Sequence, residues 1–338
     1  PQLPTIMRKH LLPLLLAAGL QLPAPAAVTL KFATLAPDGS TWMQTFDAVR
    51  KEIGEVSGGN IKVKAFPSGV LGEEKDVLFK MKVGQVDGAG FLGAGTSQVC
   101  PDADALMVPM LFRTYEEVDA VLAAMGPHLE AQALKNGYVL LGWTEIGFNY
   151  LYSTVPVKSL DDLRRAKPWA LQNDELLAEL FKAGGISGIP VSVGDVLVSL
   201  QTGLLQTVFA PPLAAVSMQW HTRVKFRNDT RLMYSVGGVF LSARAWEKIP
   251  ADLRPKVKEI FAKHLAELRV KVRKSNDEAL QVLEKQGVQV AASTPEQVVQ
   301  FEKLRDATVA GLNGRAFSNE AWSQVMKHLE AARAAPKP

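Results

Sequence analysis

Two hydrophobic periods alternate along the chain. From Val28 to Phe32 every second residue is apolar, which is typical of a half-buried strand. Pro37, Asp38 and Gly39 then break the pattern, and Ser40 is a candidate N-cap for a helix. The apolar residues that follow recur at helical spacing: Trp42, Phe46, Val49 and Ile53.

The same alternation continues through the later segments. "YVLLGWTE" has strand character, "NDELLAELFKAGG" is a helix closed by Gly184 or Gly185, and "VGDVLVSLQTG" is a helix ending at Gly203. One helical pattern runs from Pro250 to about Lys285. Strands that alternate with helices predict an α/β fold with a mainly parallel sheet flanked by helices.

The chain is long enough for two lobes, each with its own core, yet no flexible linker separates them. We therefore expect the chain to cross between lobes more than once, near Gly147–Leu151 and near Tyr234–Val239. The predicted division is residues 28–147 plus 235–272 for lobe 1, 148–234 plus 273–330 for lobe 2, and a tail at 331–338. Two α/β lobes joined in this way predict a clamshell that closes on a ligand.

Residues 1–27 differ in character from the rest. Arg8 and Lys9 precede the apolar run "LLPLLLAAGLQL", and Ala24 and Ala26 fit a small-residue cleavage site. This order is that of a secretory signal, so we expect the mature chain to be exported to the periplasm. The remaining composition is ordinary, with 47% hydrophobic and 21% charged residues and a net charge of +4. The sequence has no basic stripe interleaved with aromatic residues, so we do not expect a nucleic-acid partner.

The sequence offers no catalytic or metal-binding set. There is no G-x-S-x-G motif, and the five histidines are scattered without metal-ligand spacing. Cys100, the only cysteine, precedes a proline and is interpreted as a small buried residue. The glycines of "GAGFLGAGTS" lack the spacing of a phosphate loop. The acidic pairs Glu73–Glu74 and Asp161–Asp162 are interpreted as helix caps. Together, these observations lead us to expect neither an enzyme nor a bound cofactor.

One segment is unusual for a turn at the rim of an α/β sheet. Residues 208–216, "VFAPPLAAV", contain two prolines and no side chain that can form a hydrogen bond. Such turns ordinarily carry polar groups that hold a ligand. Either this turn belongs to the core, or it contacts an apolar ligand.

Five stretches, in order, resemble the solute-binding proteins of tripartite ATP-independent periplasmic (TRAP) transporters. The first two are "GGNIKVKAFPSGVLGEEKDVLFKMKVGQVDGA" and "VPMLFRTYEEVDAVL". "SLDDLRRAK", "LAELFKAGG" and "SLQTGLLQ" follow in register, and the likeness covers about Val28 to Lys285. The resemblance implies a two-lobed exported binding protein with a long helix bracing both lobes. It also implies delivery of the ligand to a membrane permease driven by an ion gradient, and a helical-repeat periplasmic protein is a further possible partner.

The chain departs from the family pattern where the ligand is held. In the family an arginine in Lys-Ile-Arg-Val-Pro binds the ligand carboxylate, and Trp169 stands there in this chain. A second family arginine follows Gly-Phe, where this chain has Asn149. The family turn Gln-Glu-Asn is replaced by Val208, Phe209 and Ala210. The family's polar loop after the third strand is replaced by "GFLGAG" in this chain.

We therefore expect a cleft recast for an apolar or amphipathic ligand, with Asn149 orienting a polar head group. Two alternatives stay open: a carboxylate-binding protein that uses another cation, or a sensor or scaffold that has lost transport. The nearest substitute cations are Lys167, Arg164 and Arg244. The candidate ligand-binding residues are Leu35, Trp42, Phe66, Phe91, Leu92, Phe148, Asn149, Trp169, Leu171, Phe209 and Ala210.

Overall fold

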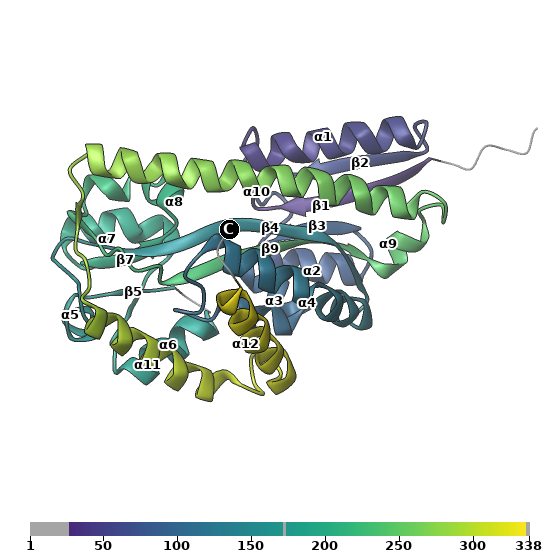
Figure 1. The fold of residues 1–338 in the computed structure, drawn as a ribbon. Helices are drawn as coiled ribbons and strands as arrows, with labels where there is room; N and C mark the ends of the chain where they lie inside the picture. Colours follow the sequence, from purple (N-terminus) through teal and green to yellow (C-terminus); the bar gives the residue numbers. More distant parts are fainter. Residues whose placement is uncertain (1–26, 172–173, 336–338) are drawn as a thin grey trace, which may run out of the picture.

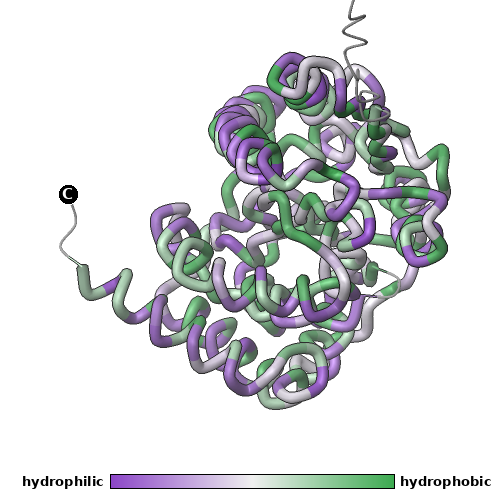
Figure 2. The backbone as a smooth tube through the Cα atoms, turned by 90° about the vertical axis from the view of Figure 1, so that its right-hand side faces the viewer, coloured by the Kyte–Doolittle hydropathy of each residue, from purple (hydrophilic) through white to green (hydrophobic). Residues whose placement is uncertain are grey.

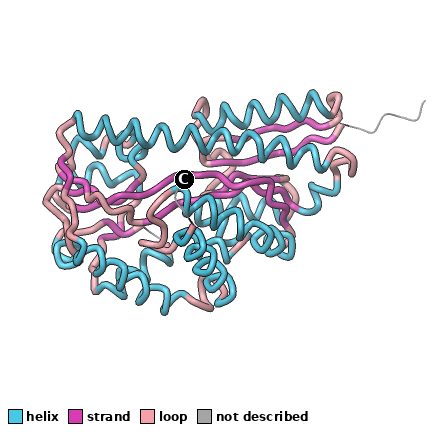
Figure 3. Tube along the Cα trace, in the orientation of Figure 1, coloured by secondary structure: helices cyan, strands magenta, loops and turns pink. Residues whose placement is uncertain are grey.

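The computed structural model describes residues 27–171 and 174–335. The predicted signal lies outside the described residues except for its last residue, and so do the final three residues of the predicted tail. Within the described residues, strands form a central layer with helices on both sides (Figures 1 and 3).

Eight strands of the described chain form one sheet in the order β10-β8-β4-β9-β3-β1-β2, with β7 pairing with β4. A short second sheet holds β5 and β6. The strands are β1 (Val28–Thr34), β2 (Ile61–Phe66), β3 (Gly88–Phe91), β4 (Tyr138–Ser153), β5 (Trp169–Ala170), β6 (Ile189–Pro190), β7 (Thr207–Ala210), β8 (Phe226–Arg227), β9 (Met233–Ser242) and β10 (Gln289–Val290).

The prediction of a mainly parallel sheet is wrong. In the main sheet only the pairings β1–β2, β1–β3 and β8–β10 are parallel, whereas β9 is antiparallel to both β3 and β4, and β4 is antiparallel to β7 and β8. The reason is the pair of long strands: β9 returns beside β4 in the opposite direction, from Asn149↔Met233 to Tyr138↔Ser242. A local hydrophobic period does not carry this information about direction.

Helices cover both faces of the sheet. The α-helices are α1 (Thr41–Val56), α2 (Glu74–Lys82), α3 (Gly93–Val99), α4 (Tyr115–Lys135), α5 (Leu160–Arg165), α6 (Glu175–Gly184), α7 (Val196–Thr202), α8 (Pro212–Ser217), α9 (Ala243–Glu247), α10 (Arg254–Lys285), α11 (Pro295–Leu312) and α12 (Asn319–Ala334). Three short 3₁₀ helices are η1 (Pro101–Met107), η2 (Val193–Asp195) and η3 (Trp220–Thr222).

Several predicted helix signals are confirmed. Ser40 caps α1 by accepting from the Met43 N–H at 3.3 Å, and Phe46, Val49 and Ile53 of its stripe are buried. Gly185 and Gly203 follow α6 and α7 with positive φ angles of 60° and 73°, which glycine adopts without strain. Apolar and polar residues alternate along the outer helices (Figure 2) because each helix buries only one face.

Around the first part of the sheet, two buried clusters lie on opposite faces. One joins α1 and α10 to the strands through residues such as Phe46, Phe261 and Leu241. The other joins α2 and α3 to the opposite face through Val77, Phe91 and neighbouring residues. A third and larger cluster fills the part built from α5–α8 and β5–β8. The elements β1–β3 and α1–α3 are called lobe 1 below, and α5–α8 with β5–β8 are called lobe 2.

Three elements run through both lobes: β4, β9 and the long helix α10 (Figure 1). The two predicted crossings lie side by side, since Phe148 of β4 pairs with Tyr234 of β9. At the chain end, α12 packs against α4, where Arg333 contacts Glu117 at 2.9 Å, and the helix continues to Ala334. The residue boundaries of the two lobes stay a prediction.

Candidate functional site

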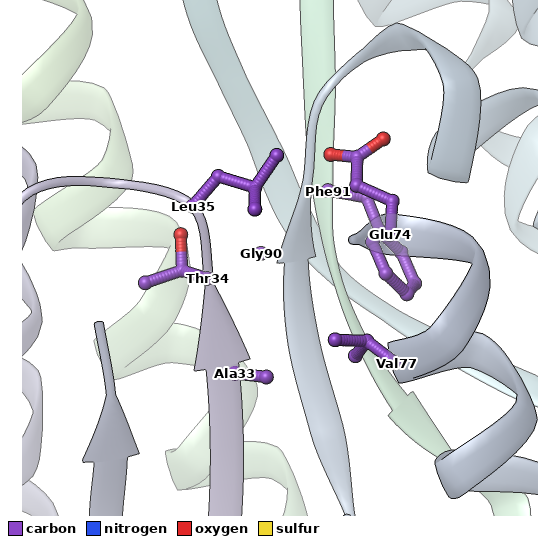
Figure 4. Close-up of a pocket in the computed structure, with 7 residues that line it drawn as sticks. All are labelled: Ala33, Thr34, Leu35, Glu74, Val77, Gly90 and Phe91. Carbon is purple, nitrogen blue, oxygen red and sulfur yellow. The ribbon is translucent and has the colours of Figure 1, made fainter. Parts of the chain in front are cut away.

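On the lobe 1 side, the candidate residues lie where two parallel strands end. β1 and β3 are adjacent and parallel, so their carboxyl ends lie at the same edge, and Leu35 and Leu92 follow them directly. Leu35 and Phe91 line a small hollow together with Ala33, Thr34, Glu74, Val77 and Gly90 (Figure 4). The hollow has room for only about one water molecule, so by itself it holds no solute.

Glu74, the first residue of α2, ties this edge together. Its Oε2 accepts from the Gly95 N–H at 2.6 Å, and its Oε1 accepts from the Leu92 N–H at the start of α3. Burial raises the pKa of Glu74, while the two backbone donors lower it. The carboxylate therefore fixes the backbone that follows β3, and the Leu92 side chain is left 44% exposed at this rim.

On the lobe 2 side, the structure brings Trp169 and Phe209 together. Their strands β5 and β7 are joined by a parallel bridge from Pro168 to Thr207, so both strands point the same way. The two rings stack with centroids 5.0 Å apart and planes 25° apart, and Trp220 meets the Trp169 ring edge-on at 5.5 Å. The Trp169 indole N–H donates to the Val191 carbonyl at 3.0 Å.

These two rings are part of the buried cluster of lobe 2. Trp169 is 4% exposed and Phe209 is 7% exposed. The turn of residues 208–216 thus begins as the buried strand β7 and continues into α8, with Pro212 at its start. The first alternative therefore holds for the start of this turn, which is core, while contact of the turn with an apolar ligand stays a prediction.

Asn149 and Phe148 point to opposite faces of β4, as consecutive strand residues do. The Asn149 Nδ2 donates to Ser235 Oγ at 2.7 Å and to the Met233 carbonyl at 3.4 Å. Phe148 faces the other way, with the Arg231 guanidinium 4.6 Å from its ring centroid. It also contacts the rings of Tyr115 and Tyr234.

The remaining candidates are spread over the two lobes. Trp42 stacks on Phe46 at 5.4 Å and lies so close to Gly90 that a side chain there would meet the indole. The Phe66 ring lies under the Lys64 ammonium, 5.0 Å away. Ala210 is buried in register with Tyr150, and Leu171 is half-buried beside the lobe 2 cluster. The assignment of all eleven residues to one ligand site stays a prediction.

The three substitute cations have other partners. Lys167 donates to the Gly203 carbonyl at 3.1 Å, and Arg164 donates to the Gly184 carbonyl at 2.8 Å while pairing with Asp161 at 2.6 Å. The Arg244 guanidinium lies against Gly84, in lobe 1. None of these partners is a candidate ligand-binding residue.

Sequence reasoning missed a group of carboxylates where η1 approaches the start of α6. Burial raises the pKa of Asp104 to about 7, and the nearby charges of Asp174 and Glu175 add to the rise. Ser97 Oγ donates to Asp104 Oδ1, and Asp174 caps α6 by accepting from the Leu177 N–H at 2.9 Å. Burial also raises the pKa of Asp174. The helix start in "NDELLAEL" points to Asp174 as a cap, but nothing in "PDADAL" marks Asp104.

Replacing Asp104 with asparagine is expected to stabilise the protein at neutral and basic pH. The folded-state pKa of about 7 lies above the ordinary value of 3.8, so the folded chain binds more protons between these values and loses stability as the pH rises from about 4 to about 7. The variant lacks this loss. Its free energy of unfolding therefore exceeds that of the wild type by an amount that grows across this range to about 1–3 kcal/mol above pH 8.

Urea unfolding at a series of pH values measures this difference. Asp277→Asn, at an exposed position of α10, is the matched control and should follow the wild type at every pH. A constant difference between Asp104→Asn and the wild type from pH 4 to pH 8 would contradict the assignment of a raised pKa to Asp104.

Two searches of the described residues bear on other functions. No cluster of three or more histidine, cysteine, aspartate or glutamate side chains among them is arranged to hold a metal ion. Their helices also include none that combines the length and the apolar character needed to span a bilayer.

Comparison with known proteins identifies the family. The pattern of the bacterial extracellular solute-binding protein family 7, DctP, matches residues 32–329. The chain therefore belongs to this family, which is the family of TRAP solute-binding proteins, and the resemblance seen in the sequence is confirmed. It is a family of solute-binding receptors and not of enzymes.

Individual relatives agree with this assignment. The chain is 33% identical to protein YiiZ of Salmonella typhimurium over 46% of this chain and 48% of that protein, so this match spans about half of the relative. It is 23% identical to the C4-dicarboxylate-binding periplasmic protein DctP of Rhodobacter capsulatus over 80% of this chain and 82% of that protein. A TRAP periplasmic solute-binding protein of Ochrobactrum anthropi superposes with a TM-score of 0.84 at 24% identity, covering 91% and 96% of the two chains. This last likeness shows that the two share the two-lobed α/β fold.

Proposed function

We propose that this chain is the periplasmic solute receptor of a TRAP-type secondary transporter. It binds a small molecule between its lobes and passes it to a membrane permease. The family membership supports this role, and so do the three elements that join the lobes, since closure about a hinge needs connections that bend without separating. A helical-repeat periplasmic protein is a further proposed partner.

The proposed ligand is a neutral apolar or amphipathic molecule. The observation that carries this choice is the Trp169 indole stacked on Phe209 at 5.0 Å, at the position where the family resemblance places a guanidinium. Loss of the cation that pairs with a desolvated carboxylate costs about 2–5 kcal/mol. An indole that meets an apolar ligand instead gains about 25 cal/mol for each Å² of apolar surface buried.

Burial disfavours negative charge at several carboxyl groups of this chain. Asp104, Asp174 and Glu74 all have pKa values raised by burial. An additional carboxylate from a ligand would face the same penalty without the family's arginine to offset it. Asn149, tied to Ser235, is the polar group proposed to meet the ligand's head group.

The names of several relatives favour a second candidate, an acid-binding receptor. One solved relative is the sugar acid binding protein DctPAm of Advenella mimigardefordensis in complex with galactonate, and a relative by sequence is the sialic acid-binding periplasmic protein SiaP of Vibrio cholerae. An acid ligand in this chain would need a cation other than those at the family positions. The third candidate, a sensor or scaffold without transport, predicts no bound solute.

Native mass spectrometry of freshly purified protein, followed by solvent extraction, distinguishes the three candidates. The proposal predicts a co-purifying neutral compound with an apolar skeleton, which extraction releases and mass analysis identifies. A co-purifying organic acid would overturn the proposed ligand class while leaving the receptor role intact. No retained compound, together with no thermal stabilisation by any member of a metabolite library, would overturn the receptor role itself.

A further inference from the structure

A buried arginine in lobe 2 lacks an anionic partner. Arg227 in β8 is 9% exposed, and no carboxylate oxygen of the described residues lies within 4.0 Å of its nitrogens. The Arg227 side chain makes one hydrogen bond to the described residues, a long one from Nη1 to the Asn228 carbonyl at 3.5 Å. The guanidinium otherwise lies over the Tyr150 ring, 5.1 Å from the centroid. A buried charge held so weakly is strongly unfavourable.

A second donor without a partner lies beside it. Tyr152 is directly opposite Arg227 in the β4–β8 pairing, so the two side chains share one face of the sheet. Tyr152 is completely buried, and its hydroxyl has no hydrogen-bond partner among the described residues. Burial raises the pKa of Tyr152, and the positive charge of Arg227 opposes the rise. The phenol therefore stays protonated and remains a donor.

The neighbouring groups are already used. Asn228 donates to the carbonyls of Val157 and Ala291 at 2.9 and 3.2 Å, and its Oδ1 accepts from the Thr230 N–H at 2.8 Å. The Tyr150 hydroxyl accepts from Arg231 Nε at 3.4 Å. Arg231 therefore adds a second positive charge at the Tyr150 hydroxyl. Among the described residues, Arg227 and Tyr152 thus offer donors that only the distant Asn228 carbonyl accepts from, in surroundings of positive charge.

We propose that Arg227 and Tyr152 form a buried site for a small monovalent anion such as chloride. The guanidinium N–H groups and the phenol O–H would donate to the same ion, which supplies both the missing acceptor and the missing negative charge. One buried cation matches one negative charge, and the complete burial of Tyr152 excludes a large ion. The site uses none of the candidate ligand-binding residues, and Tyr152 lies on the face of β4 that carries Phe148, opposite the face that carries Asn149.

Scanning calorimetry with chloride as the probe tests the proposal. Chloride replaces methanesulfonate at constant ionic strength, so that general screening does not change. The wild type should gain about 2–4 °C in melting temperature at a tenfold excess over the dissociation constant, and above that concentration the gain should rise with the logarithm of the chloride concentration. Tyr152→Phe, which removes only the hydroxyl, should need at least tenfold more chloride for the same gain.

Two further variants keep the test sharp. Arg227→Met should lose the chloride response completely, and in methanesulfonate it should melt no lower than the wild type, because it removes an unpaired buried charge. Lys225→Met, at an exposed position two residues away, should keep the full response. A crystal grown in bromide should show an anomalous peak between Arg227 and Tyr152. A wild type whose melting temperature does not rise with chloride, an equal response in Arg227→Met, or a water molecule in place of bromide would overturn the proposal.

Discussion

Replacing Arg273 with methionine is expected to lower the free energy of unfolding by about 3–5 kcal/mol. Arg273 of α10 joins Glu145 of β4 to Asp119 of α4: Nη2 lies 2.8 Å from Glu145 Oε2 and 2.7 Å from Asp119 Oδ1. Its guanidinium also lies 4.2 Å from the centroid of the Tyr115 ring. The Glu145 side chain is only 1% exposed, so the variant leaves a buried carboxylate without its cation.

This network lies where the elements common to both lobes meet. Tyr234 of β9 donates from its hydroxyl to Glu145 at 3.1 Å. The buried Glu145 carboxylate of β4 is thus bonded to β9 and α10, and α4 joins the network through Asp119 and Arg273. Urea unfolding measures the loss. Lys274→Met, which breaks an exposed pair with Glu278, is the matched control and should change stability by less than about 0.5 kcal/mol. Adding Glu145→Gln to Arg273→Met should recover part of the loss, and a loss below about 1 kcal/mol in the single variant would contradict the account.

Replacing Trp169 with alanine is expected to lower the free energy of unfolding by about 3–5 kcal/mol and to weaken ligand binding at least tenfold. The indole contacts both Phe209 and Trp220, and its N–H is bonded to the Val191 carbonyl, so the variant loses packing and leaves an acceptor unpaired. The ligand effect follows from the proposed position of Trp169 at the cleft wall.

Trp322→Ala separates the two effects. Trp322 is a half-buried indole of α12 that packs on Phe317 and is not one of the candidate ligand-binding residues. Its loss should lower stability but leave the ligand affinity unchanged when both variants are titrated below their melting temperatures. Equal affinity in Trp169→Ala and the wild type would place Trp169 in the core alone.

Local patterns in the sequence were sufficient for much of the fold. The helical stripe from Trp42 to Ile53, the N-cap at Ser40 and the glycine after each of α6 and α7 are interactions between near neighbours, and each leaves a period or a turn residue that can be read directly. The long helix was also predicted, although it begins at Arg254 instead of Pro250. The two crossings inferred from the lack of a linker lie on β4 and β9, which pair side by side, and the division into lobes stays a prediction.

Contacts between distant residues left no such signal. The direction of β9 depends on pairing with β4 across more than eighty residues, and Glu74 caps α3 from another helix. For the candidate site, the family resemblance singled out Trp169 and Phe209, which lie in contact; their place in the ligand site stays a prediction. It did not reveal that Asp104 approaches Asp174, or that Arg227 is buried without a carboxylate, because burial and charge pairing depend on the tertiary fold.

Calorimetric titration with a matched pair of ligands tests the central claim, that this cleft lacks the cation its relatives use. The pair is a carboxylic acid and its primary amide on the carbon skeleton identified by extraction, titrated at about pH 8, where the acid is ionised. We predict that the amide binds at least ten times more tightly than the acid, since neither Trp169 nor Asn149 offers the acid a positive charge. Tighter binding of the acid would contradict the account.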